Sequence, residues 1–265
     1  MSYTINIRGQ LMSLDEPCVM GILNVTPDSF YAVSRAETED AIARRAREIV
    51  GQGAAIIDVG ACSTRPGSEL ATEEEEAERL RRAMRVIRQT LPEAVVSVDT
   101  FRPSVARMAV EELGADIIND VGLPKGTNHE MFRTVARLGV PYVLMSRAAD
   151  MRTILLELAR DVQLLRDCGQ KDIIIDPGFG FGKSLDENYR VMRDLSQLEL
   201  LELPVLVGVS RKRMVWQLLE VQPEQALNGT TVLNTMALER GAKILRVHDV
   251  REAVECLRIW KKEIK

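Results

Sequence analysis

Short apolar runs rich in β-branched residues recur along the chain, and each is followed by a stretch with helical spacing. There are eight of them, at residues 18–24, 54–60, 95–99, 116–120, 141–146, 172–178, 204–210 and 243–249. Near-continuous apolar strands are typical of a parallel sheet that is buried on both faces. Eight strand–helix repeats therefore predict an α/β fold, a single (β/α)8 TIM barrel. A length of 265 residues suits one barrel domain spanning 1–265.

Helical patterns fill the intervals between these runs. Residues 38–52 and 72–90 are rich in Ala, Glu and Arg with helical spacing, and the run Glu73–Glu76 is expected on a solvated helix face. Glycines follow several expected helices, where a C-terminal glycine commonly ends the helix, at positions 53, 114, 139, 169 and 241. The initial TINIRG segment is expected to form a hairpin strand that covers the bottom of the barrel.

The composition excludes several classes of function. A net charge of −4 with mixed signs argues against general nucleic-acid binding, which needs a basic surface. The first ten residues lack the apolar core of a signal peptide, and no apolar run reaches the length of a membrane span. The four cysteines form no C-x-x-C pair and His is rare, so neither a zinc site nor a disulfide framework is expected. These features indicate a cytoplasmic protein with reduced cysteines.

Polar residues gather where the expected strands end. They are Asn24, Asp58, Asp99, Asn119, Asp120, Asp176, Ser210, Arg211, Lys212, Arg246, His248 and Asp249. A single polar residue at a strand end is well explained as a cap for the next helix. Seven strand ends that all carry polar residues meet at one mouth of a barrel, which is where barrel enzymes place their active sites. The pattern therefore predicts a functional site at that mouth.

The residue types indicate the ligand. Two carboxylates and an amide, at Asp99, Asn119 and Asp176, suit a flat heterocycle with several N–H donors. A second group offers donors, cations and an oxygen ligand suited to pyrophosphate with a hard cation, and comprises Asn24, Arg65, Lys212, Arg246 and His248. No nucleophilic constellation stands out. The GFGFGK segment at 178–183 lacks P-loop spacing, so its glycines are expected to allow close packing of a loop.

Seven segments of the chain resemble the signatures of the dihydropteroate synthase family. They are MGILNVTPDSF (20–30), IIDVGACSTRPG (56–67), SVDTFRPSVA (97–106), IINDV (117–121), IIIDPGFGFGK (173–183), LVGVSRKRM (206–214) and ILRVHDV (244–250). They cover nearly the whole chain in the order found in the family. The resemblance implies the same barrel fold, and a reaction that joins 6-hydroxymethyl-7,8-dihydropterin pyrophosphate to p-aminobenzoate with release of pyrophosphate.

The resemblance also implies roles for individual residues. Asp99, Asp176 and Lys212 would be catalytic. The pterin would be held by Asp99, Asn119, Met145, Asp176, Gly208 and Lys212. Pyrophosphate would be held by Asn24, Arg246 and His248, with Mg²⁺ as cofactor bound through Asn24. The p-aminobenzoate site would contain Thr64, Arg65, Pro66, Phe181 and Ser210, closed by a mobile first loop carrying Asp28. The family also implies a homodimer formed through its last helices, for which the stripe Ala253, Leu257 and Trp260 is a candidate; packing of that stripe on the barrel is the equal alternative.

The chain departs from the family pattern in three places. After the fifth expected strand it reads MSRAADM, with Ser146 where the family usually has His and with a shorter connection. The first loop reads YAVSR (31–35), and Cys62 replaces a residue that is often Glu. Two alternatives stay open on the sequence alone. One is a pterin-dependent methyltransferase with the same barrel, and the other is a paralogue that binds pterin without condensing it.

Overall fold

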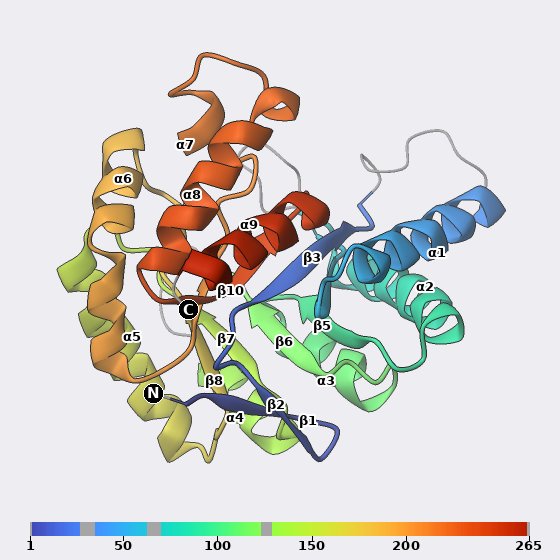
Figure 1. Ribbon diagram of the computed structural model, residues 1–265. Helices are drawn as coiled ribbons and strands as arrows, with labels where there is room; N and C mark the ends of the chain where they lie inside the picture. The colour runs from blue at the N-terminus through green and yellow to red at the C-terminus, as the bar shows by residue number, and fades with distance from the viewer. Residues whose placement is uncertain (1, 27–34, 63–69, 123–128, 264–265) are drawn as a thin grey trace.

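The centre of the protein is a closed barrel of parallel strands. A computed structural model describes residues 2–26, 35–62, 70–122 and 129–263. In these residues the barrel strands lie in the order β10-β3-β4-β5-β6-β7-β8-β9 (Figure 1). Their bounds are β3 Cys18–Asn24, β4 Ile56–Gly60, β5 Val95–Asp99, β6 Ile117–Asp120, β7 Tyr142–Met145, β8 Ile173–Asp176, β9 Val205–Val207 and β10 Ala242–Val247. Each overlaps one of the eight predicted runs, so the predicted (β/α)8 barrel is confirmed.

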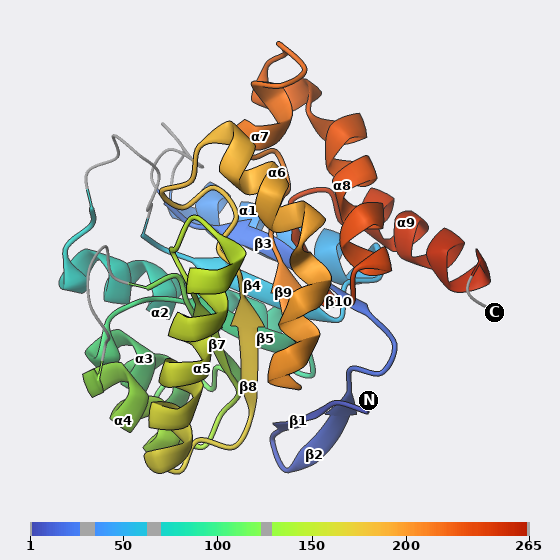
Figure 2. The same cartoon turned by 90° about the vertical axis from the view of Figure 1, so that its left-hand side faces the viewer.

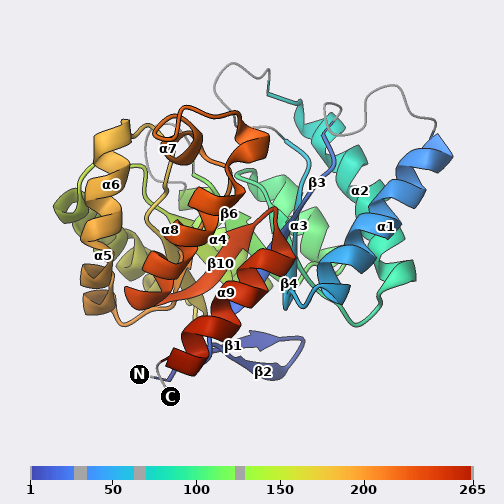
Figure 3. The ribbon, with the colours of Figure 1, turned by 45° about the horizontal axis from the view of Figure 1, so that its top comes forward.

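Helices surround this barrel on its outside (Figure 3). They are α1 Arg35–Gly51, α2 Glu73–Thr90, α3 Pro103–Glu111, α4 His129–Leu138, α5 Met151–Asp167, α6 Leu185–Arg193, α7 Arg213–Trp216, α8 Leu227–Glu239 and α9 Val250–Glu263, with 3₁₀ turns η2 Leu195–Leu201 and η3 Pro223–Gln225. The glycines expected between helix and strand adopt the left-handed conformation, as at Gly53 (φ 99°) and Gly241 (φ 90°). That conformation ends the helix and turns the chain into the next strand.

An N-terminal hairpin closes one end of the barrel. Its strands β1 (Thr4–Ile7) and β2 (Gln10–Ser13) pair antiparallel, and Figures 1 and 2 place them below the barrel strands. Ile5, Ile7 and Leu14 are buried in one apolar cluster with residues that line the bottom of the barrel. The predicted hairpin cover is therefore confirmed, and it leaves the opposite mouth as the place where ligands can enter.

The acidic run at the start of α2 is only partly solvated. Thr72 caps the helix in a reciprocal pair with Glu75, as expected for an exposed capping box. Glu76, however, is fully buried and forms an ion pair with Arg102. The expectation that all of Glu73–Glu76 lies on a solvated face was wrong for Glu76. Helical spacing turns this fourth position toward α3, where a carboxylate needs a cation to offset its desolvation.

Candidate active site

The site residues lie one layer above the apolar floor of the barrel. The floor is formed by alternate strand residues, Met20, Ile56, Ile117, Val143, Ile174, Leu206 and Ile244, in one buried cluster with the hairpin. Side chains in a strand alternate between two faces, so residues two positions further along also point into the barrel. Those residues are Ile22, Asp58, Asn119, Met145, Asp176, Gly208 and Arg246. Four of the six predicted pterin residues, Asn119, Met145, Asp176 and Gly208, are thus brought together by the same period-two pattern that builds the floor.

Arg246 joins two carboxylates across the top of the barrel. Its Nε donates to Asp58 Oδ2 at 2.7 Å, and its Nη2 donates to Asp99 Oδ2 at 2.7 Å. The amide of Asn119 donates to the same Asp58 oxygen at 3.2 Å. The other oxygen, Asp58 Oδ1, is buried and has no hydrogen-bond partner among the described residues. Asp58 therefore orients both Arg246 and Asn119, a positioning role that its place at a strand end signalled but that the family resemblance did not assign.

A row of paired residues forms the rim of this layer. Asn24 pairs with Gly60, Gly60 with Asp99, and Asp99 with Asn119 in adjacent parallel strands. A Cβ added at Gly60 would lie 3.2 Å from Asn24 Oδ1 and 3.9 Å from Asp99 Oδ2. The missing side chain keeps open the space between these two oxygens. Asn24 and Asp99, which belong to the two predicted ligand subsites, therefore face one shared opening.

The loop after β8 carries the opposite wall of the site. Asp176 Oδ1 accepts the N–H of Gly178 at 2.7 Å, which bends the chain sharply after the strand. A Cβ at Gly178 would lie 2.1 Å from the carbonyl oxygen of Ser146, and the residue has φ 69°. Only glycine fits such a backbone contact, which confirms the close packing predicted for this loop. The shortened connection after β7 therefore packs closely against the glycine-containing loop after β8. Met145 is buried beside Asp176.

The two phenylalanines of this loop have different places. Phe179 is completely buried in the core between barrel and helices. Phe181 is only partly buried, and the Lys212 ammonium lies 4.8 Å from its ring centroid. Lys212 also donates a hydrogen bond to the carbonyl oxygen of Phe179. Phe181 therefore lies at the site beside a predicted catalytic lysine, as expected, while Phe179 belongs to the core.

Burial shifts the pKa values of the central groups. It raises the pKa of Asp99 to about 7, an effect that Arg246 opposes and the charge of Asp58 increases. It also raises the pKa of Asp176, with Lys212 acting against the shift. The pKa of Lys212 is lowered to about 8 by burial, and Asp176 opposes this. Carboxyl groups with raised pKa values beside a lysine with a lowered pKa are typical of an active site.

Stability should depend on pH through Asp99. The folded protein keeps a proton on this carboxyl between about pH 4 and about pH 7, where the unfolded chain has already lost it. The free energy of unfolding is therefore expected to fall as pH rises through this window. Asp99→Asn should show a shallower fall, although Asp120 and Asp176 still contribute. Denaturant titrations of both proteins across this window measure the difference, and equal slopes would contradict the prediction.

Some predicted strand-end residues serve the scaffold instead. Asp120 follows Asn119 and so points out of the barrel, where it accepts from Tyr142 Oη at 2.6 Å. Asp249 pairs with Arg211 at 2.5 Å. Ser210 Oγ accepts from the backbone N–H of His248 at 3.1 Å, so Ser210 and His248 lie together at the rim. Four predicted residues, Asp28, Thr64, Arg65 and Pro66, lie outside the described residues.

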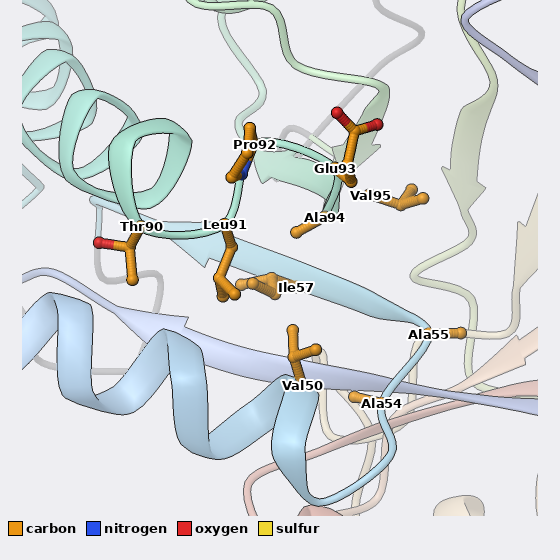
Figure 4. A pocket seen from close by; sticks show the side chains of 10 residues that line it. All are labelled: Val50, Ala54, Ala55, Ile57, Thr90, Leu91, Pro92, Glu93, Ala94 and Val95. Atoms are coloured by element: carbon orange, nitrogen blue, oxygen red, sulfur yellow. The ribbon is translucent and has the colours of Figure 1, made fainter.

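A depression at the other end of the barrel is unsuited to this chemistry. It measures about 390 Å³ and lies where α1 and α2 end and β4 and β5 begin (Figure 4). Its lining is mostly aliphatic, with Glu93 as the one ionisable side chain among the ten lining residues. In barrels of this class, conserved function resides at the carboxyl ends of strands and the other end serves stability. The polar mouth, and not this depression, is the candidate active site.

A TIM-barrel enzyme that binds a flat polar ligand is the class that this fold and mouth define. Comparison with known proteins identifies the family of the chain. The pterin binding enzyme family matches residues 20–248. The dihydropteroate synthase of Escherichia coli K12 is 38% identical over 95% of this chain and 93% of its own, and that of Bacillus subtilis is 38% identical over 90% and 85%.

Solved structures agree with these sequence relatives. Xanthomonas albilineans dihydropteroate synthase with 4-aminobenzoic acid has a TM-score of 0.88 and 36% identity, covering 100% of this chain and 99% of that chain. The same enzyme in complex with 7,8-dihydropteroate has a TM-score of 0.88 and 35% identity over 99% of both chains. The chain belongs to the pterin-binding enzyme family, and its relatives there are dihydropteroate synthases, which are transferases.

Proposed function

We propose that the protein condenses 6-hydroxymethyl-7,8-dihydropterin pyrophosphate with p-aminobenzoate and releases pyrophosphate. The observation that carries this proposal is the inward layer of Asp99, Asn119 and Asp176, which offers two carboxylates and an amide to one flat ring. The curated relatives at 38% identity are named for this activity. Asp99, Asn119, Met145, Asp176, Gly208 and Lys212 would enclose the pterin, and Asn24, Arg246 and His248 would hold the pyrophosphate.

The arrangement accounts for catalysis without a protein nucleophile. The bond from the pterin methylene to the pyrophosphate oxygen breaks, and positive charge develops on the methylene and the electron-rich ring. In their ionised forms, which for Asp99 prevail above its raised pKa of about 7, Asp99 and Asp176 place negative charge beside that ring, which favours the developing cation. Arg246 and His248 offset the charge of the departing pyrophosphate. The amine of p-aminobenzoate, held near Phe181 and Ser210, then bonds to the methylene and loses a proton.

Mg²⁺ is part of the proposal, and the residues present fit a substrate-carried ion. Asn24 presents its amide oxygen at the rim, toward the space that Gly60 leaves open. The described residues contain no cluster of three His, Cys, Asp or Glu that could hold a metal alone. Mg²⁺ commonly binds through few protein ligands together with substrate phosphates and water, and it would neutralise charge on the leaving pyrophosphate. Asn24 would then be its ligand from the described part of the chain.

One assay tests the function against its alternatives. The purified protein is given pterin pyrophosphate and p-aminobenzoate, and released pyrophosphate is measured with and without Mg²⁺. Release that requires both p-aminobenzoate and Mg²⁺ supports the synthase. Pterin binding without release would favour the paralogue that only binds pterin. Methyl transfer from a methyl-tetrahydrofolate to a corrinoid acceptor would favour the methyltransferase.

The two substrates should bind in a fixed order. The pterin subsite is built on strand ends, whereas the p-aminobenzoate subsite depends on the loops of Asp28 and Thr64–Pro66. Bound pyrophosphate supplies an anion that groups on those loops can bind. A sulfonamide, which mimics p-aminobenzoate, is therefore expected to bind well only when pyrophosphate and Mg²⁺ are present. Calorimetry decides this, because equal sulfonamide affinity with and without pyrophosphate and Mg²⁺ would refute the order.

The proposal extends to a homodimer in the cytoplasm. Ala253 and Leu257 are buried against the barrel, so this part of the predicted stripe is core. The apolar side chains that α8 and α9 expose are Val232, Met236 and Ile259, with exposed fractions of 46%, 37% and 73%. Sedimentation of wild type and Ile259→Asp tests a dimer through these helices.

Four free cysteines support a reducing compartment. No helix in the described residues is long and apolar enough to span a membrane.

A further inference from the structure

The short connection between β7 and α5 places an arginine at the mouth of the barrel. Ser146 N–H donates to Asp176 O at 3.0 Å, and Ser146 Oγ donates to Glu157 at 2.7 Å. At the other end, Asp150 caps α5 by accepting from Thr153 N at 3.0 Å. Both ends of this connection are thus tied down, which fixes the position of Arg147 between them.

Arg147 is a half-buried cation with unused donors. Its Nε donates to Val121 O at 3.3 Å, and its guanidinium carbon lies 5.1 Å from the Phe181 ring centroid. Neither Nη atom has an acceptor, and no carboxylate lies within ion-pair distance, among the described residues. Burial lowers the pKa of Arg147, while the more distant Asp120 opposes this. The Nη atoms are not among the buried unpaired polar atoms of the described residues, so a ligand that enters the mouth can reach them.

The strand order places Arg147 beside the pterin subsite. β7 lies between β6 and β8, with Val143 paired to Asn119 and Met145 paired to Asp176. Arg147 lies two residues beyond the end of β7, where the chain leaves the barrel between the strands that carry Asn119 and Asp176. β3, which carries Asn24, lies on the opposite side of the barrel. Arg147 is thus separated from the pyrophosphate residues and adjoins the place of the ring.

The acceptor atoms of the pterin ring need hydrogen-bond donors from the protein. The carboxylates of Asp99 and Asp176 can accept hydrogen bonds from the N–H groups of the ring. The ring carbonyl oxygen and the ring nitrogens that carry no hydrogen need donors instead. Lys212 Nζ uses one of its three N–H groups on Phe179 O, and Asn119 Nδ2 uses one of its two on Asp58. Arg246 is directed to Asp58 and Asp99. Arg147 reaches the same Phe181 ring as Lys212, and its Nη groups are free within the described chain. Arg147 can therefore add Nη donors to those that Lys212 and Asn119 keep.

We propose, on the basis of the function proposed above, that Arg147 is a pterin-binding residue, stacking its guanidinium beside Phe181 and donating Nη hydrogens to an acceptor atom of the ring. A planar guanidinium both stacks on a flat ring and donates from its edge, which an ammonium cannot do. The unusual MSRAADM connection therefore contributes a substrate contact of its own, in place of a longer loop.

Calorimetry with 6-hydroxymethylpterin, together with steady-state kinetics, tests this role. Arg147→Met is expected to weaken pterin affinity by about 10- to 100-fold, the usual effect of losing a hydrogen bond from a charged donor. Arg147→Lys should recover only part of the loss, because its ammonium is not planar. The matched control is Arg152→Met, at an exposed position in the first turn of α5, which should bind pterin like wild type. At saturating pterin pyrophosphate, the KM for p-aminobenzoate should change much less than the pterin affinity in Arg147→Met and stay at the wild-type value in Arg152→Met.

The outcomes separate this inference from the proposed function. Unchanged pterin affinity in Arg147→Met, with an unchanged melting temperature, would overturn it. A raised KM for p-aminobenzoate with intact pterin affinity would also overturn it, by assigning Arg147 to the second substrate. A wild type that binds pterin but releases no pyrophosphate would refute the synthase activity, while the calorimetric comparison still decides the role of Arg147.

Discussion

Replacing Asp176 by asparagine is expected to lower kcat/KM by about 100-fold or more while the melting temperature stays near that of wild type. Asparagine keeps an oxygen that can accept the Gly178 N–H, which Asp176 Oδ1 holds at 2.7 Å, so the turn after β8 is preserved. It removes the negative charge that would favour positive charge on the pterin ring. Turnover and thermal unfolding measured on the same preparation separate these two effects.

The matched control is Asp186→Asn, an exposed carboxylate in the first turn of α6. It removes the same charge ten residues further along the chain and should leave kcat/KM unchanged. Lys212→Met is expected to lose activity to a degree similar to Asp176→Asn, because methionine keeps the contact with Phe181 but supplies no donor. Near wild-type turnover in Asp176→Asn or Lys212→Met would remove that residue from the catalytic group.

Arg246→Met is expected to be costly for both stability and activity. The guanidinium offsets the charge of Asp58, whose side chain is fully buried, and of Asp99, whose side chain is 18% exposed. Removing one partner of a buried ion pair typically costs about 3–5 kcal/mol, because the remaining charge is left desolvated. Denaturant unfolding measures the loss. Pyrophosphate release should fall to background, since the proposed contact to the leaving group is also lost.

A second substitution tells the two losses apart. In the Arg246→Met background, Asp58→Asn removes the uncompensated charge and keeps an oxygen for the Asn119 amide, so part of the stability should return. Activity should not return, because no cation faces the pyrophosphate. Arg81→Met gives the scale for a solvent-screened pair: Arg81 and Glu112 are 53% and 57% exposed, and its loss should cost less than about 1 kcal/mol. A double variant no more stable than Arg246→Met would contradict the charge argument.

The sequence by itself determined the elements of the barrel and the contents of its mouth. Each buried strand appears as an apolar run, because both faces of a parallel barrel strand exclude water. The alternation within a strand is equally local, and it puts Ile56 and Asp58, or Ile174 and Asp176, on the same inward face. The sequence alone therefore predicts a floor of apolar residues, most of them followed two positions later by a residue of the polar layer.

Only the tertiary structure decided which polar groups share a partner. Arg246 meets Asp58 across 188 residues of sequence, and this contact exists because β10 closes on β3. The packing of α2 beside α3 left Glu76 buried against Arg102, contrary to the solvated face expected from its neighbours. The pairing of β7 with β8 brought Arg147 to Phe181, two residues on separate loops. Local patterns fix the face of each side chain, but the partner of a charge depends on which strands become neighbours, and that is set by the packing of the whole barrel.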